Sequence, residues 1–360
     1  MKKILTALAL VTTLATTTTH AQQLITQQFL INQEEASQIA TTIKHNWGQN
    51  IPEWFSGFYI DPDNGHLRML YNEETPEMIM LKNNFNLHTR RVEHSWNSLT
   101  SQIRRFTERY DLQNEERFRM VNRMAIDTAA NQVRRGSLAR ERVSVEIDLD
   151  LEVLAPMLVV PGSQSTKGFP HQMIDGRTGL LVVWHGTNRM ENTLVFDPVH
   201  REIPSVFGDV QEMQPQFDVS FINATDPFLQ TWGSDLIPLQ GQVIARALRE
   251  DRAEQGEEHQ FSIVSFAYSA DIFTQENERF LAKRTVVSGL EAQRGDSGAP
   301  VFLPSVTGFH RPLGMVVGIY PHDSVFTPII EARGALDEIV LENTEPNDQE
   351  ILRLRQFPLR

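Results

Sequence analysis

Gly295-Asp296-Ser297-Gly298-Ala299-Pro300 is the stretch on which the interpretation of this chain depends. It places a serine in a tight, glycine-flanked turn directly before Val301-Phe302-Leu303, an apolar run that predicts a strand. A serine that attacks a carbonyl needs an exposed hydroxyl and backbone N–H groups that converge on the developing oxyanion. The amides of Gly295 and Ser297 are the expected donors. Ordinary turns also contain this pattern, so a nucleophile is indicated only if a base and an acid accompany it.

The chain supplies a histidine and an aspartate in suitable settings. An apolar run over residues 180–184 ends in His185 and Gly186, which predicts a buried strand that delivers an imidazole to a loop. Asp218 heads an alternating apolar stretch, where an unpaired carboxylate would be costly to bury and an imidazole N–H would satisfy it. We therefore predict a catalytic group in which His185 is the base, Asp218 orients it and Ser297 is the nucleophile.

These residues and their surroundings resemble the trypsin-like serine proteases of the chymotrypsin fold, in particular the bacterial streptogrisin and alpha-lytic protease branch. The order histidine, aspartate, serine separates this group from subtilisin-like enzymes and α/β-hydrolases. The likeness covers residues 158–342 and takes in a hairpin over 166–179, a cleft strand over 313–319, and a last strand over 324–329 before a terminal helix over 330–341. It implies an all-β fold of two six-stranded antiparallel barrels with a C-terminal helix, a secreted serine endopeptidase that uses an acyl-enzyme mechanism, and no cofactor.

The chain also departs from the pattern of that family. Trp184 stands where a small residue is usual, Gly186 replaces a cysteine, and Ala299 replaces a glycine. Val317 stands near the place of a serine that binds the aspartate, so we expect Asp218 to lack one partner. These departures leave open an alternative function, that of a catalytically inactive protease-fold protein, a pseudo-protease, which acts by binding other secreted proteins.

The resemblance also assigns residues around the nucleophile. Asp296 is expected to form a buried ion pair with an internal arginine, for which Arg246 and Arg249 are the candidates, because an unpaired buried carboxylate is costly. Of the expected pocket walls, Glu291 would favour a basic substrate side chain and Arg294 an acidic or neutral one, so the preference stays open. The full set of expected walls is Glu291, Arg294, Val317, Gly318 and Ile319.

Composition limits the remaining possibilities. A length of 360 residues allows two domains, and a formal net charge of −13 argues against nucleic acid or an anionic membrane surface as a partner. The absence of cysteine excludes disulfides, thiolate metal sites and a lipoprotein anchor. Because the histidines lack paired metal-ligand spacing, we predict no metal site.

The N-terminal region predicts a leader and a second folded part. Residues 1–21 have a lysine start, a short apolar run and a small-x-small end, which indicate a signal peptide and a secreted or periplasmic bacterial protein without a membrane span. Residues 22–155 predict a hairpin over 54–71, helices over 95–110 and 114–130, and a strand over 143–149.

This N-terminal α+β part resembles the pro-region of the same branch. The resemblance implies a proenzyme with the pro-region as intramolecular partner of the protease domain, residues 156–342, and processing between residues 152 and 161. A permanent N-terminal interaction domain is the alternative. Residues 343–360 predict an acidic linker and a short tail. The other expected partners are protein or peptide substrates.

Overall fold

The structure is a computed structural model that describes residues 23–108, 124–135, 145–147, 149, 151–155, 157–160, 163–187, 194–197, 205–223, 232–275, 278–320 and 323–342. The predicted signal peptide, the C-terminal linker and tail, and residues 114–123 of the second predicted helix lie outside these ranges. Within them, no helix is both long and apolar enough to cross a membrane.

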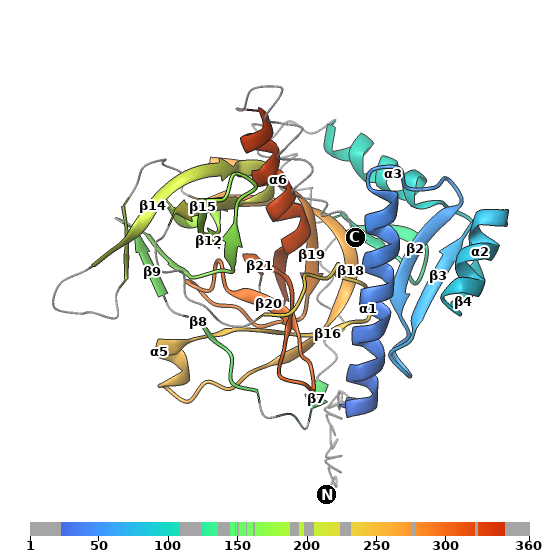
Figure 1. Ribbon diagram of the computed structural model, residues 1–360, viewed down its shortest axis with the longest axis horizontal. Helices are drawn as coiled ribbons and strands as arrows, with labels where there is room; N and C mark the ends of the chain where they lie inside the picture. The colour runs from blue at the N-terminus through green and yellow to red at the C-terminus, as the bar shows by residue number, and fades with distance from the viewer. Residues whose placement is uncertain are drawn as a thin grey trace, which may run out of the picture.

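The second half of the chain forms a closed antiparallel barrel (Figure 1). Its strands are neighbours in the order β16, β20, β21, β22, β19 and β18, and β18 pairs again with β16. Their bounds are Val243–Arg246, Pro300–Leu303, Arg311–Tyr320, Asp323–Pro328, Glu278–Ser288 and Phe261–Gln275. Apolar side chains such as Val264, Val286 and Phe326 fill the interior. One of the two expected six-stranded barrels is thus closed.

A seven-stranded antiparallel sheet precedes this closed barrel in the chain. Its strands lie in the order β10 (Ser163–Thr166), β9 (Met157–Val160), β13 (Leu194–Asp197), β14 (Ser205–Gln214), β15 (Val219–Asn223), β12 (Thr178–Val182) and β11 (Pro170–Gln172). The predicted hairpin is the β11–β12 pair, whose turn is closed by a hydrogen bond from the N–H of Met173 to the carbonyl of Arg177. No pairing between described residues closes this sheet, so the expected first barrel is not confirmed.

The predicted C-terminal helix is present as α6 (Ile329–Glu342). Its buried residues Ile329, Ala332 and Leu336 share one apolar cluster with Leu181 of β12 and Met315 of β21. The helix therefore packs on both the seven-stranded sheet and the closed barrel.

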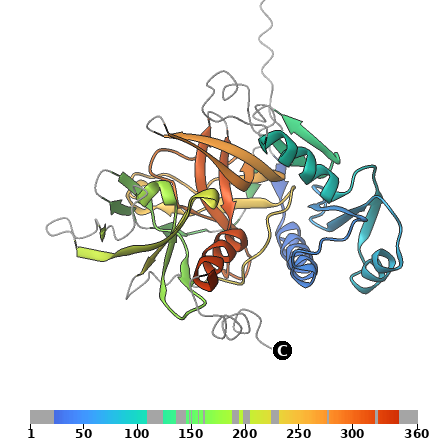
Figure 2. The ribbon, with the colours of Figure 1, turned by 90° about the horizontal axis from the view of Figure 1, so that it is seen from above.

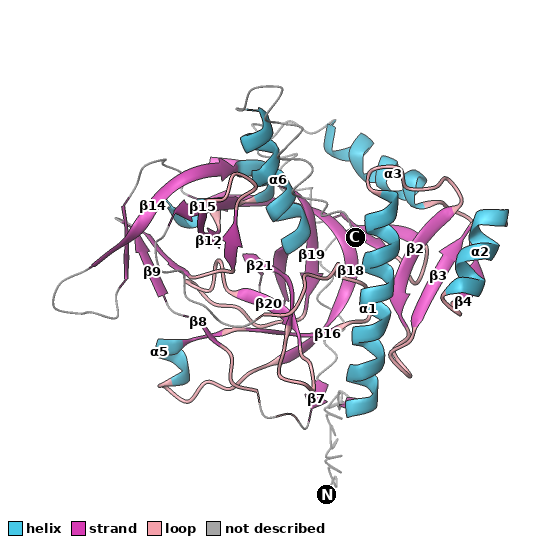
Figure 3. Cartoon of the chain, viewed as in Figure 1, coloured by secondary structure: helices cyan, strands magenta, loops and turns pink. Residues whose placement is uncertain are grey.

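The N-terminal part is α+β, as predicted (Figure 3). Helix α1 (Gln27–Trp47) begins at Thr26, whose hydroxyl accepts from the N–H of Phe29. Strands β2 (Phe55–Ile60) and β3 (Leu67–Tyr71) form the predicted hairpin, and β4 (His88–Arg91) adds to β3. Helices α2 (Pro76–Asn84) and α3 (Trp96–Glu108) complete it, α3 at the place of the first predicted helix.

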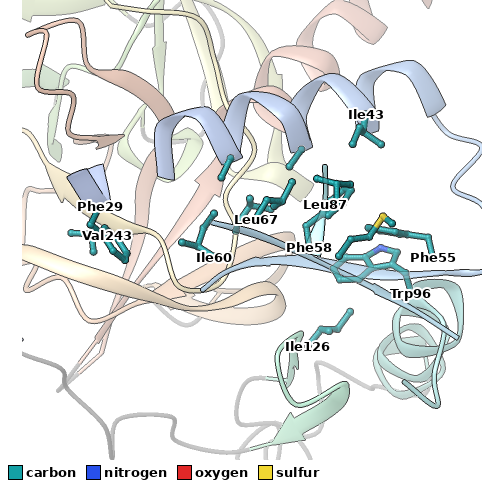
Figure 4. Packing of buried hydrophobic residues seen from close by; sticks show 14 of the residues in the cluster. Phe29, Ile43, Phe55, Phe58, Ile60, Leu67, Leu87, Trp96, Ile126 and Val243 are labelled. Atoms are coloured by element: carbon teal, nitrogen blue, oxygen red, sulfur yellow. The ribbon is translucent and has the colours of Figure 1, made fainter. Parts of the chain in front are cut away.

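Close packing between the hairpin turn and α1 explains the Asn-Gly sequence of that turn. Gly65 has φ +77°, and a Cβ there would lie 2.7 Å from the carbonyl oxygen of Phe29. Only glycine combines this backbone conformation with that approach. The apolar face of α1 then packs on β2 and β3 around Phe55, Phe58 and Trp96 (Figure 4).

The prediction of a second helix over residues 114–130 is wrong at its C-terminal end. Residues 124–127 form strand β5 (Met124–Asp127), which pairs with β18 on one side and with β6 (Gln132–Arg135) on the other. All four β5 residues are buried, and pairing with the barrel outweighs the local helical pattern. The sheet of the closed barrel thereby gains two strands from the N-terminal part.

A further pairing crosses the expected boundary between residues 155 and 156. Strand β8 (Leu154–Ala155) lies parallel to β17 (Leu248–Arg249), directly before the short helix α5 (Glu250–Ala253). The predicted strand near residue 145 is β7 (Val145–Ile147), which pairs with β1 (Gln23–Ile25). The boundary therefore does not separate two sets of strands, and processing there stays a prediction.

Candidate active site

Three separate elements deliver the predicted catalytic residues to one place. His185 lies in the 3-10 turn η1 (Trp184–Thr187) that follows β12, and Asp218 lies directly before β15. Ser297 lies in the turn between β19 and β20. His185 Nδ1 is 2.6 Å from Asp218 Oδ2, and His185 Nε2 is 2.9 Å from Ser297 Oγ. The structure thus brings the three side chains into one hydrogen-bonded row.

Asp218 is completely buried, and both of its carboxylate oxygens accept from His185. Oδ2 faces the imidazole, while Oδ1 accepts from the backbone N–H of His185 at 3.0 Å. The carbonyl of Asp218 also accepts from the N–H of Trp184. The backbone of Asp218 is left-handed, with φ +51°, a conformation that aspartate adopts more readily than most residues.

As the sequence predicts, the side chain of Val317 provides no hydrogen bond to Asp218, because it packs in an apolar cluster with Val183 and Val325. The second carboxylate oxygen is instead satisfied by the peptide N–H of the histidine itself. A carboxylate on Nδ1 places the imidazole proton there and leaves Nε2 to accept from the serine hydroxyl.

The turn around Ser297 contains two glycines with a left-handed backbone. Gly295 and Gly298 have φ values of +92° and +91°. The N–H of Asp296 donates to the carbonyl of Gln293, and the N–H of Gly298 donates to the carbonyl of Val316. Within the described part of the chain, the N–H groups of Gly295 and Ser297 have no protein acceptor. These are the two donors that the sequence predicts.

Thr166 holds this turn from the seven-stranded sheet, a role that the sequence did not indicate. Its N–H donates to the carbonyl of Ser297 at 2.8 Å, and its hydroxyl donates to the carbonyl of Gly295 at 2.7 Å. A Cβ on Gly298 would lie 2.4 Å from the carbonyl oxygen of Thr166, so a larger residue cannot occupy this position without displacing the strand.

An arginine cluster holds the same turn from the closed barrel. Asp296 is completely buried, and its Oδ2 accepts from Arg252 Nη1 at 2.9 Å and from the N–H of Gln293 at 2.8 Å. Arg252 Nη2 donates to the carbonyl of Arg294, and Arg246 Nε donates to that of Glu291. Two guanidinium groups thus fix a carboxylate and two carbonyls of the loop that precedes Ser297.

Of the two arginines proposed from the sequence, one contributes to this contact. Arg246 Nη2 lies 3.5 Å from Asp296 Oδ2, so it assists, but the closest partner is Arg252, which the sequence analysis missed. Arg249 was expected at Asp296 and is instead paired with Asp251 through two bonds of 2.7 Å. These bonds raise the pKa of Arg249 and lower that of Asp251. The Nη1 atom of Arg249 lies beside Gly295, 2.1 Å from the position that a Cβ on this glycine would take.

The expected pocket residues divide into exposed and buried groups. Glu291 and Arg294 are exposed, and Glu291 Oε2 accepts from Gln260. Val317 and Gly318 are buried on β21, whereas Ile319 is exposed. Their assignment as walls of a substrate pocket stays a prediction.

Gly186 has no room for a side chain, because a Cβ there would lie 2.9 Å from the Cβ of Ser165.

No group of three or more histidine, aspartate or glutamate side chains in the described ranges could hold a metal ion.

Comparisons with known proteins find a likeness of structure alone. No protein-family model matches the sequence, and no curated protein matches it significantly. Among solved structures, a Nocardiopsis protease is 13% identical, with a TM-score of 0.39, over 52% of this chain and 97% of its own. A glutamic acid specific serine protease is 19% identical, with a TM-score of 0.39, over 51% and 97% of the two chains. A Cellulomonas bogoriensis chymotrypsin is 13% identical, with a TM-score of 0.37, over 51% and 97%. These neighbours are chymotrypsin-fold bacterial serine proteases.

Proposed function

We propose that this protein is a serine endopeptidase that hydrolyses peptide bonds in protein or peptide substrates. The observation that carries the proposal is the hydrogen-bonded row of Asp218, His185 and Ser297. In it, the imidazole Nδ1 lies 2.6 Å from the carboxylate Oδ2, and Nε2 lies 2.9 Å from the serine Oγ. It is supported by the backbone N–H groups of Gly295 and Ser297, which have no acceptor among the described residues and suit the oxygen of a tetrahedral intermediate.

The reaction proceeds in two steps. Ser297 Oγ attacks the scissile carbonyl carbon while His185 Nε2 takes the hydroxyl proton, and the carbonyl oxygen becomes an anion bound by the N–H groups of Gly295 and Ser297. When the intermediate collapses, the C–N bond breaks and His185 returns the proton to the leaving amine.

The acyl group is then an ester on Ser297, which water hydrolyses with His185 again as base. Asp218 keeps the imidazole oriented and stabilises its protonated form throughout. None of these steps calls for a cofactor.

The protein is made as a precursor. The proposal includes removal of the signal peptide, residues 1–21, on export to the periplasm or the medium, and a later cut between residues 152 and 161.

Hydrolysis of unfolded casein by the secreted protein tests this function. The parent and Ser234→Ala, which changes an exposed serine outside the row, should release peptides at the same rate. Ser297→Ala should lower the rate by at least about 10³-fold, because no other group supplies the nucleophile. Equal and undetectable rates for all three proteins would contradict the proposal and favour the pseudo-protease.

A further inference from the structure

The N-terminal segment, defined here as residues 23–135, adds strands β5 and β6 to the sheet of the closed barrel. Ala125 pairs with Ser269, and Met124 and Ile126 pair with the residues on either side of it. Strand β18 in turn belongs to the closed ring through β16 and β19. Without β5, this part of β18 would have an unpaired edge, which favours aggregation. Figure 2 shows the N-terminal elements against the barrel, on the side away from β14.

Two glutamines, the buried Gln33 and the half-buried Gln240, form hydrogen bonds between the N-terminal segment and the barrel. Gln33 of α1 is completely buried, and its amide binds Val243 of β16 as a neighbouring strand would. Its Oε1 accepts from the N–H of Val243 at 2.9 Å, and its Nε2 donates to the carbonyl of Val243 at 3.2 Å. The side chain of Gln240 accepts from the N–H of Ala129 and donates to Asp127.

The two parts also share apolar cores. One cluster contains Phe29, Ile60 and Ile126 of the N-terminal segment together with Leu239 and Val243 (Figure 4). A single core that draws on both parts is typical of one folding unit, whereas a released segment would leave a large apolar patch exposed.

A second shared cluster lies directly behind the candidate site. Ala125 of β5 packs in it with Val183, two residues before His185, and with Val317 of β21. Removal of β5 would therefore open the core that supports the turn carrying the candidate base. The N-terminal segment leaves the row itself accessible, because Ser297 and His185 remain partly exposed with the segment in place.

From these contacts we infer that the N-terminal segment is a permanent part of the working protein. It stays bound without a covalent link after the chain is cut, and the candidate site requires its presence. Retention stands on the interface alone, whereas the requirement for the site rests on the proposed function.

A designed cut tests retention. A recognition sequence for a site-specific protease is placed between Arg135 and Val145 of the full chain, and the purified protein is cut and passed over a sizing column in native buffer. We expect both fragments to elute together at the volume of the uncut protein. Separate elution of the fragments in native buffer would overturn the inference.

The same samples test the requirement for the site. The cut complex should react with a fluorophosphonate probe at the rate of the uncut protein. A C-terminal fragment isolated in denaturant and returned to native buffer should react at least tenfold more slowly. Reaction of that isolated fragment at the full rate would overturn this part. If the uncut protein does not react, the proposed function fails, while co-elution still decides retention.

Two variants of α1 locate the contact. Gln33→Glu keeps the acceptor for the N–H of Val243, removes the donor to its carbonyl and buries a charge, so the cut complex should dissociate at least tenfold more readily. Gln27→Glu, at an exposed position of the same helix, is the control and should leave dissociation unchanged. Equal dissociation of the two variants would contradict the role of Gln33.

Discussion

Thr166 binds the turn of Ser297 from the opposite sheet, with its N–H on the carbonyl of Ser297 at 2.8 Å. Its hydroxyl donates a hydrogen bond to the carbonyl of Gly295 in the same turn. These bonds hold the peptide groups that join Gly295 to Asp296 and Ser297 to Gly298, and so fix the backbone on both sides of the turn. Thr166 is therefore a positioning residue, and it joins the seven-stranded sheet to the closed barrel at the candidate site.

Thr166→Val should slow the chemical step without weakening substrate binding. The variant keeps the shape and the backbone bond but loses the hydroxyl that donates to Gly295. We expect kcat to fall about fivefold, since a net hydrogen bond contributes about 1 kcal/mol, with KM little changed. Steady-state kinetics on a peptide substrate measure this, and Thr166→Ser should recover most of the rate. A variant whose KM rises while kcat stays constant would point to a binding role instead.

Arg252→Met should damage both the fold and the oxyanion loop. It removes the closest cation from the buried carboxylate of Asp296, and breaking a buried pair costs about 3–5 kcal/mol. Urea unfolding should show this loss, and probe labelling of Ser297 should fall with it. Arg249→Gln, whose parent side chain pairs with Asp251, should lose less stability. The reverse order of the two variants would show that Arg249 holds the loop.

Asp218→Asn should leave the fold intact and lower kcat by about 10⁴-fold, the size of effect known when a triad aspartate is made neutral. The asparagine amide would present a donor to Nδ1 and favour the tautomer with the proton on Nε2, which then cannot accept from Ser297. Kinetics with circular dichroism as a check on folding measure this. A loss below tenfold would show that Asp218 does not set the tautomer.

His259 should make the protein sensitive to acid. Its Nε2 accepts from the N–H of Val153, directly before β8, and its Nδ1 lies 3.0 Å from the carbonyl of Arg246, to which it donates. Burial lowers the pKa of His259 to about 4. Since the unfolded chain binds this proton near pH 6.5, the contribution is complete above pH 6.5 and is lost as the pH falls through about 4.

His259→Gln can keep both hydrogen bonds and removes the titration. Between pH 6.5 and pH 4 its Tm should therefore fall less than that of the parent. His45→Gln, at an exposed position, is the control and should follow the parent. Parallel Tm curves for the parent and His259→Gln would contradict the assignment.

Much of this architecture can be predicted from short stretches of the sequence. Strand β20 and the β2–β3 hairpin were predictable because short apolar runs alternate or end at glycine turns. The row of His185, Asp218 and Ser297 was predictable in the same way, since each residue stands at the end of a recognisable strand or turn. Helix α6 was expected from the family resemblance.

Other features depend on contacts between distant residues. Strand β5 has a helical pattern in its sequence context, and only its pairing with β18, more than 130 residues later, makes it a strand. Arg252 rather than Arg249 reaches Asp296 because of where α5 begins, which the sequence does not reveal. Thr166 looks like any strand residue until the nucleophile turn is placed beside it.

The most direct test of the account is covalent labelling of the secreted protein by a fluorophosphonate, read by intact mass and by peptide mapping. We expect a single adduct on Ser297 in the parent and none in Ser297→Ala or in His185→Ala, because the hydroxyl reacts only when Nε2 accepts its proton. A parent that stays unlabelled, or that carries its adduct on another serine, would contradict the claim that these three residues form a working catalytic site.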